Sequence, residues 1–337
     1  MKLHQKFGLI LSTISLLSIM SYANAETKVI ASIKPLHSLV SYVMDGVGTP
    51  GILVDGSSSP HTFQLKPSHA TMLQEADIVF WIGEDLESFL ETPLESIAAN
   101  SRHITLMESD EIELLKFREK NIFGGHDDHD DHGDEHDEHA DEHGDEHDEH
   151  DEHADEHGDE HDDHHDGHAH GEHDIHFWLD PEIAKTIVKI VTRELSEIDP
   201  SNASTYESNS TKAINEIDQL ISDTKSKINS NASYVVFHDA YQYFEKRFGV
   251  EVVGALTVNP EVLPGAKQLS EIREVIEHEN INCLFSEPQF NPSIAETIAQ
   301  DTGVKAAVID PLGAELNPGK DLYFDLIGNI ASSFESC

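Results

Sequence analysis

The sequence feature that most restricts the fold is a block at residues 126–174 without any large apolar side chain. The block holds 16 His, 25 Asp or Glu, 5 Gly and 3 Ala, and it contains no Lys or Arg. Such a segment cannot bury enough apolar surface to offset its conformational entropy, and its like charges repel one another. We therefore predict that the block is a disordered insert rich in His, Asp and Glu, and that the folded protein is built from the residues on either side.

Charge excludes one large class of partners. The 337 residues include 21 Lys and Arg against 65 Asp and Glu, which gives a formal net charge of −44. Without the block at 126–174 the balance is 40 acidic against 21 basic residues, a net charge of −19. A surface that binds phosphates needs clustered Lys and Arg. We therefore expect no nucleic-acid partner.

The first 25 residues have the pattern of a secretory signal peptide. Lys2 and Lys6 precede an apolar run at residues 7–20, and Ala23 and Ala25 are small residues suited to cleavage. No later stretch approaches the roughly 18–20 apolar residues that cross a bilayer. We expect cleavage near Ala25 and an exported protein, which is periplasmic in a bacterium with two membranes.

Short apolar runs alternate with helical patterns along the rest of the chain. In the first half, this pattern predicts strands at 28–33, 51–55 and 78–83 and helices at 35–44 and 68–76. In the second half, it predicts strands at 233–237, 250–258, 281–285 and 304–309 and helices at 240–248, 268–279 and 293–301. Alternation of this kind is typical of a parallel sheet covered by helices on both faces.

A further predicted helix, Pro181–Ile198, connects the halves. Asp180 is a favourable N-cap, and Pro181 suits the first helical position. At 1.5 Å per residue the helix is about 27 Å long. The fold class is therefore α/β, with two doubly wound parallel-sheet lobes joined by one long helix. We place the N-terminal lobe at 26–180, the connecting helix at 181–200 and the C-terminal lobe at 201–337.

Candidate metal ligands follow predicted strands or precede the connecting helix. They are His61, His176, His238 and Asp310. In an open parallel sheet, ligands bind beyond the carboxyl ends of the strands, so these side chains can meet only if the two lobes face each other. Three imidazoles and one carboxylate suit tetrahedral Zn²⁺, without excluding nickel, cobalt or copper. Spacing alone does not separate this site from ordinary loop histidines and a turn that begins at Asp310.

Several motifs resemble those of one known family. They are 33–40 (IKPLHSLV), 60–61 (PH) with 66–68 (KPS), 176–181 (HFWLDP), 237–241 (FHDAY), 287–290 (EPQF) and 310–313 (DPLG). They occur in the family's order over nearly the whole chain outside the insert. The family is that of the solute-binding proteins of zinc ABC importers, the ZnuA type, which has manganese-binding relatives. The resemblance implies two α/β lobes joined by a long helix, with Zn²⁺ bound between them as the transported ligand. It also implies delivery to a membrane permease that works with a cytoplasmic ATPase.

The resemblance also implies individual ligands. It assigns His61, His176 and His238, with Asp310 as the fourth donor in some members. Manganese-binding members carry Glu where His238 stands, so His238 favours zinc. Some zinc-binding members have Glu immediately before the first ligand, where this chain has Pro60. Asp310 and a water molecule therefore both remain candidates for the fourth donor.

The two cysteines, Cys283 and Cys337, are expected to form a disulfide. An exported chain with an even number of cysteines favours this pairing, and the resemblance implies the same pair. A cysteine metal site is the alternative. It is disfavoured because Cys283 lies within a predicted apolar strand and Cys337 is the last residue.

The insert resembles the histidine-rich loop that many zinc-binding members carry. Its carboxylates would concentrate cations and its neutral imidazoles would supply nitrogen donors, so we predict weak, multisite zinc collection; a merely solubilising acidic segment is the alternative. Free imidazoles protonate near pH 6.5, so collection should weaken below that pH. The auxiliary ligands that we expect are His126, His129, His132, His136, His139, His143, His147, His150, His153, His157, His161, His164, His165, His168, His170 and His173.

Competing functions are a zinc hydrolase, a zinc buffering or storage protein, and a binding protein for Mn, Ni or Co. A hydrolase needs an open coordination position and a nearby general base. The sequence has no His-Glu-x-x-His helix and no Gly-x-Ser-x-Gly elbow. We therefore predict a monomeric zinc transport component that is not an enzyme and has no organic cofactor. The histidines that match no ligand position are His37, His69, His103 and His278.

Overall fold

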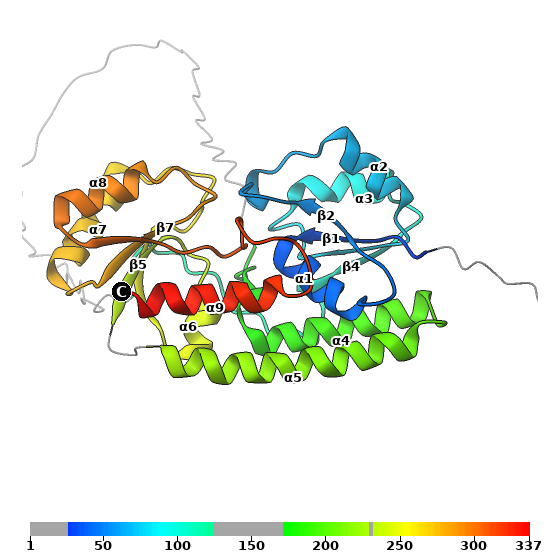
Figure 1. Ribbon diagram of the computed structural model, residues 1–337. Helices are drawn as coiled ribbons and strands as arrows, with labels where there is room; N and C mark the ends of the chain where they lie inside the picture. The colour runs from blue at the N-terminus through cyan, green and yellow to red at the C-terminus, as the bar shows by residue number, and fades with distance from the viewer. Residues whose placement is uncertain (1–25, 124–170, 229–231) are drawn as a thin grey trace, which may run out of the picture.

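The structure, a computed structural model, describes residues 26–123, 171–228 and 232–337. The predicted signal peptide at 1–25 and most of the predicted insert lie outside these residues. Figure 1 shows two lobes of sheet and helix side by side, with long helices running beneath both. Among the described helices, none is long and apolar enough to cross a membrane.

The N-terminal lobe is built on a parallel sheet whose strands, in the described residues, have the order β2-β1-β3-β4. Three short 3-10 helices, η1 to η3, lie in its connections. The elements are β1 (Val29–Ile33), α1 (Lys34–Val43), β2 (Gly51–Val54), η1 (Pro60–Thr62), α2 (Pro67–Glu75), β3 (Ile78–Trp81), η2 (Ser88–Leu90), α3 (Glu91–Ser96), β4 (Arg102–Thr105) and η3 (Leu106–Glu108).

The C-terminal lobe repeats this topology with the parallel order β6-β5-β7-β8 in the described residues. Its helices α6 and α8 both end at a glycine with positive φ, Gly249 (72°) and Gly303 (76°). The elements are β5 (Ser233–His238), α6 (Gln242–Phe248), β6 (Glu251–Thr257), α7 (Ala266–His278), β7 (Cys283–Ser286), α8 (Ser293–Thr302) and β8 (Lys305–Val308). The predicted α/β class with two parallel sheets is confirmed.

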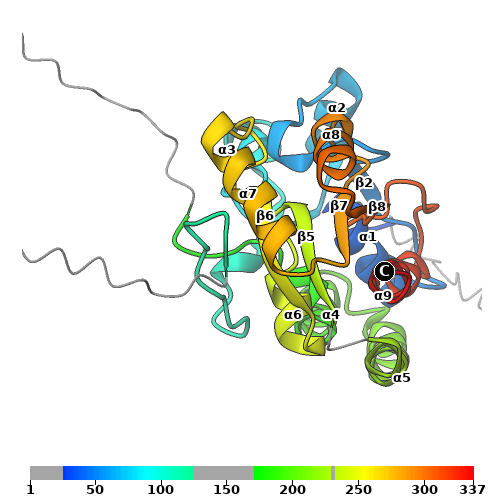
Figure 2. The same ribbon diagram turned by 90° about the vertical axis from the view of Figure 1, so that its left-hand side faces the viewer.

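Two long helices, not one, join the lobes. Helix α4 (Pro181–Ile198) has the predicted bounds, and the Asp180 carboxylate accepts a hydrogen bond from the Glu182 backbone N–H, as expected of an N-cap. Helix α5 (Ala203–Lys227) packs along α4 and also contacts α1. The last helix, α9 (Leu322–Glu335), packs against α1 and α5, so the chain returns from the C-terminal lobe to the N-terminal lobe (Figure 2).

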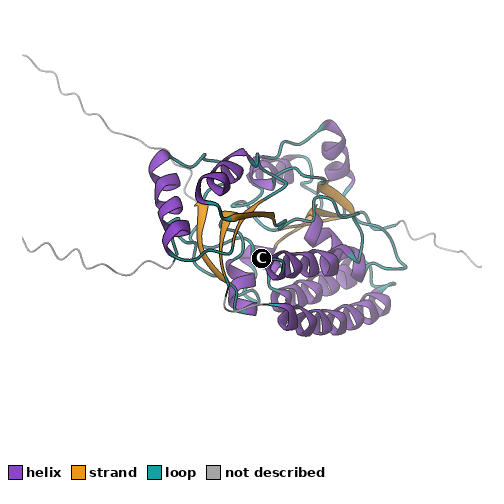
Figure 3. Ribbon diagram, turned by 60° about the vertical axis from the view of Figure 1, so that its left-hand side comes forward, coloured by secondary structure: helices purple, strands orange, loops and turns teal. Residues whose placement is uncertain are grey.

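Successive residues of the central strands pack on opposite faces of each sheet, as the period of a strand requires. Val29 and Ala31 belong to a central core, whereas Ile30 belongs to an outer cluster beneath α2 and α3. In the C-terminal lobe, Val236 faces the central core and Val235 packs with α7 and α8. Figure 3 shows the strands as a layer between helices. The central core runs through both lobes and includes residues of α1, α4, α5 and α9, which ties the lobes into one body.

Residues 115–123 form a strap from the N-terminal lobe to the edge of the C-terminal sheet. The Phe123 backbone N–H donates to the Val253 carbonyl (2.8 Å), and Ile122 forms an antiparallel bridge with Gly254 in β6. Glycine is needed at this bridge, because a Cβ on Gly254 would lie 2.8 Å from the Asn121 carbonyl oxygen. The strap therefore extends the C-terminal sheet beyond β6.

The chain re-enters the described structure beside the strap. The Asp174 backbone N–H donates to the Leu115 carbonyl (2.8 Å), and the Phe117 N–H donates to the Glu172 carbonyl (3.1 Å). The Asp174 side chain is only 2% exposed. Our prediction therefore ended the insert too late, because residues 171–174 belong to the folded protein.

The predicted disulfide joins Cys283 and Cys337. Cys283 is the first residue of β7, and Cys337 follows α9. The bond therefore fixes the end of the chain to the amino-terminal edge of the C-terminal sheet, away from the carboxyl ends of the strands.

Candidate metal centre

Three of the predicted ligands come from separate parts of the fold. His61 lies in η1 after β2, and His238 is the last residue of β5. His176 precedes the 3-10 helix η4 (Phe177–Leu179), which leads into α4. His176 and His238 are 5% and 3% exposed, whereas His61 is only partly buried. The site therefore has two histidines in the interior and one at its opening.

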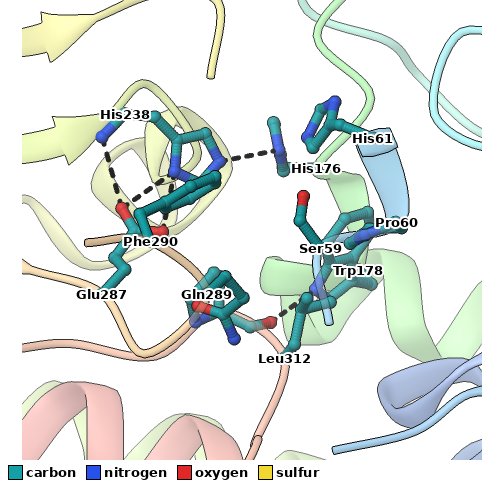
Figure 4. Close-up of a pocket in the computed structure, with 11 residues that line it drawn as sticks. Ser59, Pro60, His61, His176, Trp178, His238, Glu287, Gln289, Phe290 and Leu312 are labelled. Atoms are coloured by element: carbon teal, nitrogen blue, oxygen red, sulfur yellow. Dashed lines mark hydrogen bonds and ion pairs between the residues drawn. The ribbon is translucent and has the colours of Figure 1, made fainter. Parts of the chain in front are cut away.

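The structure brings these imidazoles together between the lobes (Figure 4). One ring nitrogen of each of the three lies within 4.8 Å of the other two. The Nε2 atoms of His176 and His238 are 3.4 Å apart, and the ring centroids of His61 lie 5.8 Å and 5.9 Å from those of His176 and His238. The arrangement can hold one small cation that all three nitrogens share.

A carboxylate fixes each of the buried imidazoles. The Nδ1 atom of His176 lies 2.8 Å from an Asp174 oxygen, and Nδ1 of His238 lies 2.8 Å from a Glu287 oxygen. Each carboxylate also accepts the backbone N–H of the same histidine. With the Nδ1 proton donated to a carboxylate, each ring presents the lone pair of Nε2 to the centre, which is the tautomer that binds a metal.

Electrostatics favour a cation at this point. Burial, reinforced by the His238 ring, lowers the pKa of His176 well below its usual value, so the imidazole stays neutral. Burial also raises the pKa of Asp174 to about 7. The raised pKa of Asp174 means that burial destabilises its negative charge more than the neighbouring protein groups stabilise it. A divalent cation beside His176 would stabilise the ionised carboxylate and offset the cost of burying its own charge.

Apolar walls surround the centre. Trp178 packs with its ring centroid 5.2 Å from that of His176, and the Phe290 ring lies 5.3 Å from that of His238. Pro60, Pro311 and Leu312 line the same pocket. These groups limit access of water, which strengthens electrostatic interactions inside the pocket.

Asp310 is not part of the group of three imidazoles. One of its carboxylate oxygens accepts the backbone N–H groups of Leu312 and Gly313, and the other accepts that of Ala314. The Gln289 amide donates to it as well (2.8 Å). The carboxylate thus shapes the turn at 310–314, the ordinary role that the sequence had left open.

The remaining histidines lie elsewhere. His37 and His103 have an Nε2 atom near a backbone carbonyl, that of Pro50 and of Ala98 respectively, and His278 is exposed at the end of α7. His69 accepts the Lys66 backbone N–H. Of the predicted auxiliary ligands, only His173 lies within the described residues, and the others fall in 124–170.

Sequence reasoning missed the two orienting carboxylates. The sequence places Asp174 within the acidic block at 126–174, and Glu287 stands out only as the first residue of the motif 287–290. Asp174 stands two residues before His176, so its proximity to a predicted ligand could have been noted. Glu287 lies 49 residues from His238 in sequence, and only the pairing of β5 with β7 brings the two together.

Two facing parallel α/β lobes with a buried imidazole cluster between them define a two-lobed metal-binding protein of the solute-binding class. The family model described as "Zinc-uptake complex component A periplasmic" (ZnuA) matches residues 29–337. The chain belongs to the ZnuA family.

Individual relatives agree with this assignment. The chain is 43% identical over 319 residues to the high-affinity zinc uptake system protein ZnuA of Brucella abortus, covering 94% of this chain and 93% of that protein. It is 40% identical over 329 residues to the protein of the same name from Haemophilus influenzae, covering 96% of each. A crystal structure of ZnuA has the same fold, with a TM-score of 0.70 at 21% identity, covering 93% of this chain and 99% of the other. The predicted family is confirmed. Because the family is one of periplasmic zinc-uptake components, the hydrolase alternative is set aside.

Proposed function

We propose that this protein binds Zn²⁺ through the Nε2 atoms of His61, His176 and His238. It then delivers the ion from the periplasm to the membrane permease of an uptake complex, which a cytoplasmic ATPase powers. The observation that carries the proposal is the convergence of three ring nitrogens within 4.8 Å, with both buried rings held by carboxylates at Nδ1.

The donor set favours zinc over the alternative metals. Mn²⁺ prefers carboxylate and carbonyl oxygens, whereas imidazole nitrogens suit Zn²⁺. Nickel and cobalt also accept imidazole, but three nitrogens that converge on one point impose no octahedral or square geometry on them. Competition of Zn²⁺ against Mn²⁺, Ni²⁺ and Co²⁺ for the mature protein tests this choice, and the proposal predicts that none displaces zinc at equal concentration.

The fourth coordination position is proposed for a water molecule. Asp310 makes four hydrogen bonds within its own lobe, three of them to the backbone of the following turn, and would have to give these up to reach the ion. Pro60, which lines the pocket, offers no ligand side chain. An Asp310→Asn variant keeps an acceptor for the turn, so its zinc affinity should stay within about threefold of the parent.

The decisive experiment is a zinc titration of the mature chain and its His238→Ala variant. The proposal predicts one tight site in the parent, absent from the variant, above a background of weak binding. His278→Ala is the matched control, because His278 is exposed and distant from the cluster. Weak binding alone in the parent would favour buffering or storage instead.

We further propose that residues 126–170 collect zinc when it is scarce and pass it to the cluster. A deletion that tests this should end at residue 170, because removing 171–174 would also remove Asp174, the partner of His176. The expected result is an unchanged tight site with slower zinc uptake by starved cells. Uptake at the parental rate would contradict the relay.

Other parts of the proposal have simple tests. N-terminal sequencing of the exported protein should begin at Glu26, after cleavage near Ala25. Sedimentation of the mature protein should give a monomer.

We retain lobe boundaries at 26–180 and 201–337, with α5 and α9 as helices shared by both lobes.

A further inference from the structure

Two large apolar side chains project from one loop of the C-terminal lobe. Val262 and Leu263 are 59% and 78% exposed, the highest fractions for large apolar side chains in the described part of the chain. They lie in the loop at 258–265, between β6 and α7. Apolar side chains that are exposed next to one another mark interaction sites more often than isolated ones do.

The loop is held in one conformation by internal hydrogen bonds. The Thr257 hydroxyl interacts with the Asn259 carbonyl (2.5 Å) and the Val262 carbonyl (3.3 Å), and it accepts the Asn259 backbone N–H (3.1 Å). The Asn259 side chain accepts the N–H of Glu261 (2.8 Å). A preorganised loop loses little conformational entropy when a partner covers it.

The same loop borders the metal centre. Thr257, where it begins, is the cross-strand partner of His238 in the β5–β6 pairing. Val258 and Pro260 line a pocket that also contains His61 and His176. Val262 and Leu263 follow Pro260 by two and three residues, so a molecule that covers them would lie next to a pocket that reaches two of the three imidazoles.

We propose that the loop at 258–265, through Val262 and Leu263, is a docking element for the membrane permease. The partner surface that fits is an apolar hollow with a basic side chain at its rim, because Glu261 is exposed beside the two apolar residues. This inference rests on the proposed function. It identifies the surface through which the protein would bind the membrane permease.

Charge argues against two other partners for this loop, a second copy of the chain and an anionic lipid surface. A second copy of this strongly acidic chain would bring a second Glu261 and a like net charge to the contact. An anionic lipid surface would repel the same groups. The permease is also the receiver of the ion, so its contact must lie beside the metal cavity.

The test measures ATP hydrolysis by the permease–ATPase complex of the same organism in lipid nanodiscs, as a function of zinc-loaded protein. The variant is Val262→Ser/Leu263→Ser in the full mature chain. The control is Val308→Ser, since Val308 is 58% exposed on β8 and outside the loop. The concentration for half-maximal stimulation should rise at least about tenfold for the double variant and not for the control. Zinc affinity of both variants should equal that of the parent.

Each other result contradicts the inference. Equal stimulation by the double variant and the parent would overturn the docking surface alone. A parent that binds zinc without stimulating the complex would overturn the proposed function and the inference with it. Loss of a parental dimer in the double variant would assign the loop to self-association, and binding to nanodiscs without the permease would assign it to lipid.

Discussion

At the scale of single residues, the candidate metal centre includes two carboxylates that contact the buried imidazoles at Nδ1. Asp174 and Glu287 each bind the Nδ1 side of a buried imidazole and the backbone N–H of the same residue. These contacts orient the rings with Nε2 toward the cluster, and the carboxylates place negative charge close to the three converging nitrogens. His61 is positioned differently, by a proline-started 3-10 helix at the pocket opening.

Glu287→Gln should weaken zinc binding by roughly 10–100-fold, because the amide keeps the shape of the side chain but not its charge. Competition with a chelator of known affinity measures the change. Glu279→Gln, at an exposed position after α7, serves as the control and should bind zinc like the parent. An affinity within twofold of the parent would mean that Glu287 does not orient His238.

Glu87 should make the free energy of unfolding depend on pH. It is fully buried, and burial raises its pKa to about 7, although it accepts the backbone N–H groups of Ile82 and Gly83. Between its ordinary pKa of 4.5 and 7 the folded protein binds more protons than the unfolded chain, so Glu87 lowers stability as pH rises through this range, by about 3 kcal/mol at pH 8.

Glu87→Gln should remove this dependence. Urea denaturation of the zinc-free protein at pH 4.5, 6 and 8 should show the variant gaining stability over the parent as pH rises. Glu84→Gln is the control, because Glu84 is exposed in the same loop. Parallel pH profiles for Glu87→Gln and the parent would contradict the assignment.

The three candidate ligands could be predicted from the sequence, but the residues that hold them in place could not. The resemblance pointed to His61, His176 and His238, and the structure brings them together. The role of Asp310 could not be derived, because a carboxylate before Pro311 suits both a metal and a turn. Its hydrogen bonds to the backbone of 312–314 depend on how the turn folds, which the sequence does not specify.

At the scale of elements, the start of α4 connects the metal centre to the inter-lobe helices. Asp180 caps the helix and also forms a bidentate pair with Arg247 of α6, at 2.7 Å and 2.8 Å. The cap lies four residues after His176, so it anchors the turn that carries this histidine.

Asp180→Ala should lower the free energy of unfolding by about 2–4 kcal/mol, since it removes both the cap and the partner of Arg247. Asp180→Asn keeps a cap acceptor and should lose about half as much. Chemical denaturation of the zinc-free proteins measures both values. Equal losses for the two variants would show that the cap contributes nothing.

Some elements carried a strong sequence signal and others did not. Asp180 as N-cap and Pro181 at the first helical position located the start of α4 to the residue. The 25-residue helix α5 was missed because its buried positions include Asn209, Ser210 and Thr224, which blur the apolar period. Strand β4 was missed because it begins with Arg102 and His103 and is only partly buried.

At the scale of the whole molecule, a core that is continuous through both lobes resists wide opening. Residues of α1, α4, α5 and α9 belong to this core together with strands of both sheets. The strap at 115–123 adds a further connection, in which Arg118 pairs with Asp239 and Glu245. Release of the ion should therefore involve loops at the strand ends more than separation of the lobes.

The disulfide should stabilise the molecule without affecting the metal centre. Cys283 and Cys337 are 54 residues apart in sequence, and Cys283 lies at the opposite end of β7 from Glu287. Replacing both with Ser should cost about 2–4 kcal/mol of folding free energy in denaturation experiments. Zinc affinity should stay within about twofold, because the orienting carboxylate keeps its place. A loss of affinity as large as that of Glu287→Gln would contradict this separation.

Anomalous diffraction at the zinc absorption edge tests the central claim most directly. Crystals of the mature chain lacking residues 126–170, loaded with one equivalent of zinc, should show one strong peak at about 2.0–2.1 Å from the Nε2 atoms of His61, His176 and His238. A principal peak elsewhere, with these three imidazoles bound to nothing in common, would contradict the account.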